Sequence, residues 1–221
     1  MSALSARDGY RLWAPRYNAE TAVSHLEEIL VTGFNVPTDD RVLLDVGCGT
    51  GRRLSHANAS VAVGIDLSPE MLARAIGTRT VAAADVLALP LRDGWFDVIW
   101  CRLVLGHMRD VAAAYAELSR VCRPGGAVIV TDFHATAIKA GHRRTFRDPS
   151  GAIVEVEHHV YVPATHVAAA QAVGLELLAQ QEGAIGPDVR EFFAKVNRLD
   201  AYQAQIGLPV VLALSFQKSA A

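Results

Sequence analysis

A buried strand that runs directly into a glycine-rich loop is the feature that most constrains this chain. Arg41–Val46 is short, apolar and β-branched, which is typical of a strand covered on both faces. Gly47, Gly49 and Gly51 follow it, and we expect a helix to begin near Gly51. Glycines permit positive φ and let a ligand lie against bare backbone, and a helix N-terminus supplies free N–H groups. The segment therefore predicts a ligand-binding turn in an α/β domain.

Strands and helices alternate through the first two thirds of the chain. The other expected strands are Val61–Ile65, Thr80–Ala84, Phe96–Cys101 and Ala127–Thr131. We expect helices from a cap at Asn18 to Gly33, from a cap at Ser68 to near Gly77, and from a cap at Asp110 through Val121. Such alternation predicts a parallel sheet with helices on both faces.

The alternation breaks after the fifth strand. Arg143–Arg147 and Ala152–Val160 read as an inserted β-hairpin joined by a turn at residues 148–151. Side-chain alternation places Val154, Val156, His158 and Val160 on one side and Glu155, Glu157, His159 and Tyr161 on the other. A helix from about Ala164, a strand near Leu175–Gln181, a helix near Val189–Leu199 and a last strand at Val210–Phe216 complete the expected elements.

Composition favours one domain over residues 1–221, because 51% of the 221 residues are hydrophobic and no linker is visible. A formal net charge of −2 argues against broad binding to nucleic acid. Cys48, Cys101 and Cys122 fit no metal or disulfide pattern, which suggests reduced thiols and a cytoplasmic protein. We expect neither a signal peptide nor a membrane span.

An acid stands two residues before the first glycine of the loop. A dinucleotide loop would have G-x-G-x-x-G spacing and would place a pyrophosphate at the helix N-terminus. Here the spacing is Gly47-x-Gly49-x-Gly51, and Asp45 precedes it. A carboxylate at that place would repel a pyrophosphate but could face a cation or an amine.

With these features the chain resembles the class I S-adenosylmethionine-dependent methyltransferases. The resemblance covers residues 40–132 and rests on the joint spacing of five elements. The elements are the glycine loop Asp45–Gly51, Gly64–Asp66, Ala84–Val86 with the run to Phe96, Val104–Asp110, and Leu118–Gly126. The chain departs from the pattern at Gly106, where a first histidine is common, but keeps the second as His107. The subgroup that it is most similar to contains ubiquinone/menaquinone-pathway and biotin-pathway methyltransferases.

This resemblance implies a Rossmann-like, seven-stranded, mainly parallel sheet whose last strand is antiparallel. It also implies that an N-terminal helical cap (residues 1–35) and the inserted hairpin (residues 136–162) cover the cleft. The N-terminal aromatic residues, Tyr10, Trp13 and Tyr17, would then either pack on the domain or form a lid over the cofactor. A cation–π contact with a sulfonium would favour the lid.

The cofactor that the resemblance implies is S-adenosyl-L-methionine, with S-adenosyl-L-homocysteine as product. Asp66 would hold both ribose hydroxyls, Asp85 and Val86 the adenine, and the backbone near Cys101–Leu103 the methionine end. Cys48 would be a small spacer in the loop. The full set of expected cofactor-binding residues is Tyr17, Asp45, Gly47, Cys48, Gly49, Asp66, Leu67, Met71, Asp85, Val86, Cys101 and Arg102.

The expected reaction is direct displacement of the methyl group by an O, N or C nucleophile of a small-molecule acceptor. Alignment alone can carry much of such a reaction, so a base is needed only when the nucleophile is protonated. His107 and His134, after the fourth and fifth strands, are the candidate bases, because an imidazole titrates near neutral pH. Arg143 and Arg144 could hold a carboxylate or phosphate of the acceptor, but solvated surface is the favoured interpretation.

No metal site is expected, because His158 and His159 are adjacent on a strand and point to opposite faces. One of them lining a substrate pocket is the alternative. Two other functions stay open: a non-catalytic cofactor-binding or regulatory protein, and a nicotinamide-dependent oxidoreductase. The sequence shows no Asn-Pro-Pro-Tyr-type tetrapeptide after the fourth strand and no basic appendage, so a small-molecule acceptor is preferred over nucleic acid or protein. The acceptor, the pathway and the oligomeric state stay undetermined.

Overall fold

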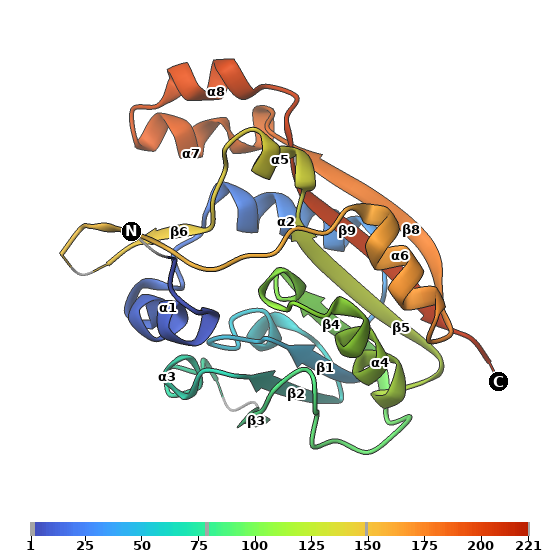
Figure 1. The fold of residues 1–221 in the computed structure, drawn as a ribbon. Helices are drawn as coiled ribbons and strands as arrows, with labels where there is room; N and C mark the ends of the chain where they lie inside the picture. Colours follow the sequence, from blue (N-terminus) through green and yellow to red (C-terminus); the bar gives the residue numbers. More distant parts are fainter. Residues whose placement is uncertain (1–2, 78–79, 149, 221) are drawn as a thin grey trace.

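The computed structural model describes residues 3–77, 80–148 and 150–220. Its main feature is a seven-stranded sheet in the order β3-β2-β1-β4-β5-β9-β8 (Figure 1). The strands are β1 (Val42–Val46), β2 (Val61–Asp66), β3 (Thr80–Ala83), β4 (Phe96–Arg102), β5 (Cys122–Phe133), β8 (Leu175–Ala184) and β9 (Pro209–Lys218). The predicted Rossmann-like fold is therefore confirmed.

Strand directions also follow the prediction. β1 to β5 pair in parallel, whereas β9 is antiparallel to both β5 and β8. Because the parallel strands share their direction, the carboxyl ends of β1, β2 and β4 meet at one edge of the sheet. Ligands bind at this edge in open α/β sheets.

Helices cover both faces of the sheet. The helices α4 (Val111–Val121) and α6 (Pro163–Gln171) pack on one face, and α2 (Ala22–Gly33) packs against β8 and β9 on the other (Figure 1). Along β1 the side chains alternate between the two faces of the sheet. Leu44 packs in the hydrophobic cluster that contains the buried residues of α4, and Leu43 packs in the cluster that contains Val31 of α2.

Two predicted helix caps are confirmed and one is wrong. Asp110 accepts from the backbone of the first turn of α4, and Ser68 caps α3 (Pro69–Leu72). The cap of α2 is Thr21, which forms a capping box with Ser24. Asn18 instead accepts a hydrogen bond from the Thr50 hydroxyl, so it ties the N-terminal segment to the glycine loop.

Two predicted helices are shorter than expected. After Gly51 only a 3₁₀ helix, η2 (Leu54–His56), forms before β2 begins, because the connection has no room for a full helix and its return. The helix α3 is a single turn and ends well before Gly77. The N–H groups beside the glycine loop therefore belong to a turn and not to a long helix.

The predicted helix near Val189–Leu199 is divided. The structure has η4 (Pro187–Val189), α7 (Arg190–Lys195) and a further helix, α8 (Leu199–Gln205), which the sequence analysis missed. Asn197 separates α7 from α8 with a φ of 54°. Asparagine tolerates this left-handed conformation and commonly ends helices, and that signal was available in the sequence.

The N-terminal segment and the hairpin lie together beside the sheet edge (Figure 1). This part comprises α1 (Ala6–Trp13), η1 (Ala14–Arg16), β6 (Thr145–Arg147) and β7 (Ile153–Glu155), and η3 (Leu105–His107) and α5 (Ala135–Lys139) follow β4 and β5. Leu4 bridges to Val156, and Trp13 stacks on Phe146 with ring centroids 5.0 Å apart. α1 also packs against α3.

The hairpin is shorter than predicted. Its second strand ends at Glu155, and the Val156 amide makes one more bond across the hairpin, to the Arg144 carbonyl. Beyond it the segment pairs elsewhere, because the Glu157 amide donates to the Leu4 carbonyl and the His159 amide to the Gly106 carbonyl. The side-chain alternation expected as far as Val160 therefore stops there. Pro149, part of the expected turn, lies outside the described residues.

Across residues 3–77, 80–148 and 150–220, none of the helices combines the length and the apolar character that a bilayer crossing requires.

Candidate functional site

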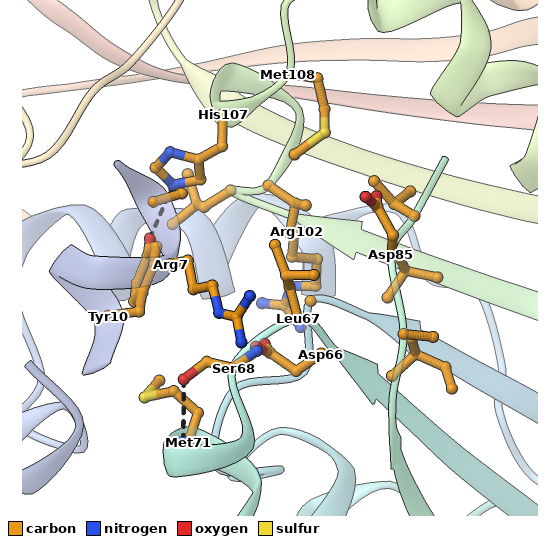
Figure 2. A pocket seen from close by; sticks show the side chains of 18 of the residues that line it. Arg7, Tyr10, Asp66, Leu67, Ser68, Met71, Asp85, Arg102, His107 and Met108 are labelled. Carbon is orange, nitrogen blue, oxygen red and sulfur yellow. Dashed lines mark hydrogen bonds between the residues drawn. The ribbon is translucent and has the colours of Figure 1, made fainter. Parts of the chain in front are cut away.

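A pocket of about 80 Å³ lies at the carboxyl ends of β1, β2 and β4, with α1 beside it. Figure 2 shows Tyr10, Arg7 and His107 on one side, Asp85 on the other, and Asp66 and Ser68 below. The expected cofactor-binding residues that line it are Tyr17, Gly47, Asp66, Leu67, Met71, Asp85, Val86 and Arg102. The expected residues that do not line it are Asp45, Cys48, Gly49 and Cys101.

The glycine loop is bound to the neighbouring strand. The amides of Gly47 and Cys48 donate to the Ile65 carbonyl over 2.7 and 3.0 Å. Gly47 and Gly49 have φ values of 73° and 58°, which favour glycine. A Cβ at Gly47 would lie 2.2 Å from Val104, and one at Gly49 would lie 3.1 Å from Tyr17. A side chain at position 49 would therefore crowd the Tyr17 ring, which lines the pocket.

Asp66 is the polar centre of the pocket floor. One carboxylate oxygen accepts from the Gly49 amide at 2.8 Å and the other from the Ser68 amide at 2.8 Å. Burial raises the pKa of Asp66, and the two backbone hydrogen bonds oppose that shift. A carboxylate oxygen has a second lone pair, so Asp66 can still accept from two hydroxyls of a ligand. The bonds to the loop and to α3 hold it in place.

Asp45 lies beneath the loop and not in the pocket. It is 1% exposed, and neither carboxylate oxygen has a hydrogen-bond partner among the described residues. Burial raises its pKa to about 7 against the opposing charges of Arg53 and Arg102. The structure therefore does not bring Asp45 to the surface that a ligand would touch.

The two cysteines that the analysis expected near the cofactor are also buried. Cys101 is 0% exposed and Cys48 is 6% exposed. Burial raises the pKa of both thiols, so they stay protonated and unreactive. Both are buried side chains that do not line the pocket, and the role of Cys48 as a small spacer in the loop stays a prediction.

The backbone that follows β4 turns sharply at the pocket. Leu103 has a φ of 59°, which is an uncommon conformation for a bulky residue. Its amide donates to the Thr131 carbonyl at 2.9 Å and to the Thr131 hydroxyl at 3.0 Å. The Arg102 guanidinium bonds to Glu27 away from the pocket. Arg102 and Leu103 line the pocket, and the contact of this segment with the methionine end of a cofactor stays a prediction.

His107 is bonded at both ring nitrogens. Its Nδ1 lies 3.0 Å from the Glu157 carbonyl, and its Nε2 lies 3.0 Å from the Tyr10 hydroxyl (Figure 2). A carbonyl only accepts, so Nδ1 carries the proton and Nε2 accepts from Tyr10. Burial, with the Arg144 charge, holds the pKa of His107 well below its usual range. The premise that this imidazole titrates near neutral pH therefore does not hold here.

His134 is placed elsewhere. It caps α5 by accepting from the Thr136 amide at 3.2 Å, and its Nε2 lies 3.5 Å from a Glu182 oxygen. It does not line the pocket. The structure thus gives His134 a helix-capping position, and it does not bring the two candidate bases together.

His158 and His159 diverge, although not on a strand. His158 lies 3.3 Å from Asp132, and His159 lies 3.7 Å from Glu157. Neither lines the pocket. Within the described part of the chain, no group of three or more His, Cys, Asp or Glu side chains could hold a metal ion.

Several pocket residues were not predicted from the sequence. Arg7, Ser68, Val104 and Met108 all line it. Arg7 lies one helical turn before Tyr10, so the two share a face of α1, and this spacing was readable once α1 was expected. No sequence signal indicated that this face would turn toward the glycine loop.

A second cavity of about 210 Å³ adjoins the first, since Tyr17 and Leu103 line both. It lies between the N-terminal segment and the hairpin. Arg52, Arg53, Arg143, Arg144 and His142 line it together with Trp13 and Phe133. Arg144 is only 7% exposed, so the favoured interpretation of this residue as solvated surface was wrong, whereas Arg143 is exposed.

A family model described as "Methyltransferase domain" matches residues 44–130. The chain is 34% identical to the 27-O-demethylrifamycin SV methyltransferase of Amycolatopsis mediterranei over 55% of this chain and 49% of that protein. It is 30% identical to the malonyl-[acyl-carrier protein] O-methyltransferase of Serratia marcescens over 79% of this chain and 69% of that protein.

The fold is similar to that of an S-adenosylmethionine-dependent methyltransferase from Mesorhizobium loti, with a TM-score of 0.68 and 22% identity. The match covers 87% of this chain and 98% of that one. Against several curated relatives the chain spans about half of their length or less, 49%, 35%, 52% and 42% in four of them.

Proposed function

The chain belongs to the class I S-adenosylmethionine-dependent methyltransferases, and from this premise we propose that it transfers a methyl group to an oxygen, nitrogen or carbon nucleophile of a small-molecule acceptor. The observation that carries the proposal is the pocket at Asp66. A carboxylate held by two backbone amides faces a cavity beside a loop of left-handed glycines. This arrangement fits the vicinal hydroxyls of the cofactor's ribose.

The residues around Asp66 fit the rest of the cofactor. Leu67, Met71 and Val86 supply apolar surface for a flat base, and Asp85 is available at its edge. The Asp85 carboxylate already accepts from the Leu87 amide at 2.9 Å, which orients it. We assign the adenosyl part of the cofactor to this side of the pocket.

The opposite side of the pocket is assigned to the methionine part. Tyr10 and Tyr17 bring aromatic rings 5.9 Å apart to this region, and Leu103 exposes strained backbone there. When bound, S-adenosylmethionine supplies a methyl group on a positively charged sulfur, and aromatic faces stabilise such a cation. Tyr17 and Leu103 also border the second cavity, which would place the acceptor next to the methyl group.

The protein contributes to the transfer mainly by positioning the acceptor against the methyl group and by excluding water. In-line displacement needs the acceptor atom held close to the methyl group, and such alignment can contribute several kcal/mol. His107 is neutral and its Nε2 is bonded to Tyr10. Because burial and the Arg144 charge hold the pKa of His107 low, we propose no general-base role for this residue. For His134 we propose no role in the chemistry.

The acceptor is proposed to be a small molecule that enters the second cavity. The relatives named above act on compounds that differ widely, and their names assign no acceptor to this chain. The retained loop and Asp66 make a purely regulatory role less well supported. The G-x-G-x-G spacing disfavours a nicotinamide cofactor.

Calorimetric titration with S-adenosylhomocysteine tests the proposal, with NADH as the control ligand. We expect the wild type to bind S-adenosylhomocysteine and not NADH. Asp66→Ala should weaken binding by more than about tenfold, which corresponds to about 1.4 kcal/mol. Asp188→Ala, at an exposed position outside the pocket, should bind like the wild type.

Absence of product binding by the wild type, or preference for NADH, would overturn the cofactor assignment. Equal affinities of Asp66→Ala and Asp188→Ala would remove Asp66 from the site. Product binding without methyl transfer to any acceptor in a broad screen would favour the regulatory alternative.

A further inference from the structure

We propose that the second cavity is an anion-binding subsite, in which Arg144 holds a carboxylate or phosphate group of the methyl acceptor. This inference rests on the proposed function, because it names a chemical class for the acceptor of the same reaction. The subsite is defined by Arg144, Arg52, Trp13, Tyr17 and Phe133, all of which line the cavity.

Arg144 is a buried cation whose donors are not all used. It is 7% exposed, and its Nε and Nη1 have no hydrogen-bond partner among the described residues. Its guanidinium lies 5.2 Å from the Phe133 ring centroid and 5.8 Å from the Tyr10 ring centroid, and it also interacts with the Tyr10 hydroxyl. Arginine offers five donors in a planar fork that matches a carboxylate or phosphate. Leaving such donors unpaired in a buried place is costly, so a ligand that satisfies them would be bound strongly.

The wall of the cavity is positively charged. None of its described lining residues is an Asp or a Glu, whereas Arg52, Arg53, Arg143 and Arg144 all line it. Arg53 is paired with Glu27 at 2.7 Å, and Arg143 lies 3.9 Å from Glu155 and donates to the carbonyls of Ile138 and His142. Arg144, and Arg52 at a half-buried position, are thus left to attract an anion, since neither has an ion-pair partner within the described ranges.

The apolar part of the cavity indicates what carries the anion. Trp13 is fixed by stacking on Phe146, and Tyr17 packs edge-on against Trp13 with centroids 5.3 Å apart. Rigid aromatic walls favour a flat or apolar body at low entropic cost. Because Tyr17 and Leu103 also border the first pocket, such a body would extend from Arg144 toward the methyl group. An acidic aromatic or acidic apolar acceptor fits this shape.

The test uses three probes of similar shape: benzoate, phenyl phosphate and the neutral benzamide. Each is titrated into the protein saturated with S-adenosylhomocysteine, and the indole N–H signals of the three tryptophans are followed by NMR. Trp13 lines the cavity, whereas Trp95 and Trp100 do not and serve as internal references. We expect at least one anionic probe to shift Trp13 and to bind at least about tenfold more tightly than benzamide. Tighter binding of benzoate would indicate a carboxylate acceptor, and of phenyl phosphate a phosphate acceptor.

Two variants test whether Arg144 causes the preference for the anionic probe. Arg144→Gln should lose the preference for the anionic probe while it keeps the wild-type affinity for S-adenosylhomocysteine. Arg147→Gln is the matched control, because Arg147 is an exposed arginine of the same hairpin that does not line the cavity, and it should change neither affinity. Should Arg144→Gln fail to bind S-adenosylhomocysteine, Arg144→Met replaces it, since this variant also removes the charge and should lose the anion preference.

The inference is overturned if no anionic probe shifts Trp13, if benzamide binds as tightly as both anions, or if a folded Arg144→Gln or Arg144→Met variant keeps the preference for the anion. A wild type that does not bind S-adenosylhomocysteine would instead contradict the proposed function. The two failures are therefore distinguishable in one series of titrations.

Discussion

Two arginines of this protein are almost equally buried, yet their surroundings are opposite. Arg102 is 3% exposed and bonds to Glu27 through Nε at 2.6 Å and Nη2 at 2.7 Å, and to Glu28 at 2.7 Å. Arg144 is 7% exposed and faces aromatic rings and a cavity. Burying a charge is costly unless it is paired, so the first arrangement is complete and the second is not.

Arg102 is a paired cation that joins several elements of the fold, whereas Arg144 has donors without a partner among the described residues. Glu27 on α2 connects Arg102 at the end of β4, Arg53 after the glycine loop and the Thr131 hydroxyl on β5. Burial alone would raise the pKa of Glu27, but Arg53 and Arg102 together lower it to about 2. This network holds the loop and the ends of two strands in register. Arg144 makes no comparable connection.

The largest expected effect comes from breaking the paired cation. Arg102→Met should lower the free energy of unfolding by about 3 kcal/mol, because one partner of a buried ion pair is lost and the acid beside it stays buried. Urea denaturation monitored by far-UV circular dichroism measures the change.

Arg144→Met is the matched control for that experiment. Its unfolding free energy should stay within about 1 kcal/mol of the wild type, because the loss of ring contacts is offset by removal of an unpaired buried charge. Equal destabilisation by the two substitutions would show that Arg144 is structural after all.

The next effect is a pH dependence at Asp45, which lies close to Arg53 and Arg102 without bonding to them. Burial raises its pKa in the folded protein to about 7, above its ordinary value of 3.8. The folded state therefore binds the proton more tightly than the unfolded state. This contribution to stability is complete below pH 3.8 and is lost as the pH rises through about 7.

Asp45→Asn removes this titration. Between about pH 5 and about pH 7 the wild type should lose more than about 1 kcal/mol of unfolding free energy relative to the variant, since one pKa unit corresponds to about 1.4 kcal/mol. Denaturation curves at several pH values measure both proteins. Parallel pH profiles would mean that Asp45 is ionised in the folded state and has a partner.

The smallest effect is expected at Glu28. This acid also contacts Arg102, but its side chain is 55% exposed. Exposed ion pairs contribute little because water and salt screen them, so Glu28→Gln should cost less than about 1 kcal/mol by the same urea measurement. A loss of unfolding free energy as large as that of Arg102→Met would show that the network depends on Glu28 as much as on Glu27.

The fold was largely readable from local patterns. The strands of the parallel half, the capping residues Ser68 and Asp110 and the antiparallel last strand follow from apolar runs, turn chemistry and the family resemblance. The errors concern lengths and breaks: the missing helix after Gly51, the short α3, and α8 beyond Asn197. Helix length depends on how far a connection must travel over the sheet, which no short window of sequence contains.

The part of the site that strand order determines could be predicted from the sequence. Asp66, the glycine loop and the residues after β3 must meet at one edge, because the carboxyl ends of parallel strands lie together. Local sequence could not tell that Asp45 and Cys101 point beneath that edge, or that His134 caps a helix. Each of these residues has the right place along the chain, and only packing decides which way its side chain points.

Sequence by itself therefore determined the sheet, the glycine loop, the family and the acid at the floor of the pocket. The loop and the acid depend on spacing within one strand-turn-strand unit, and the sheet and the family depend on the joint spacing of several such units. Spacing of both kinds is contained in the order of the residues. Only the tertiary structure decided that Arg102 is paired and Arg144 is not. Glu27 reaches Arg102 across 75 positions, and the hairpin brings Arg144 to rings of α1 and β5, so the pairing depends on contacts between distant segments.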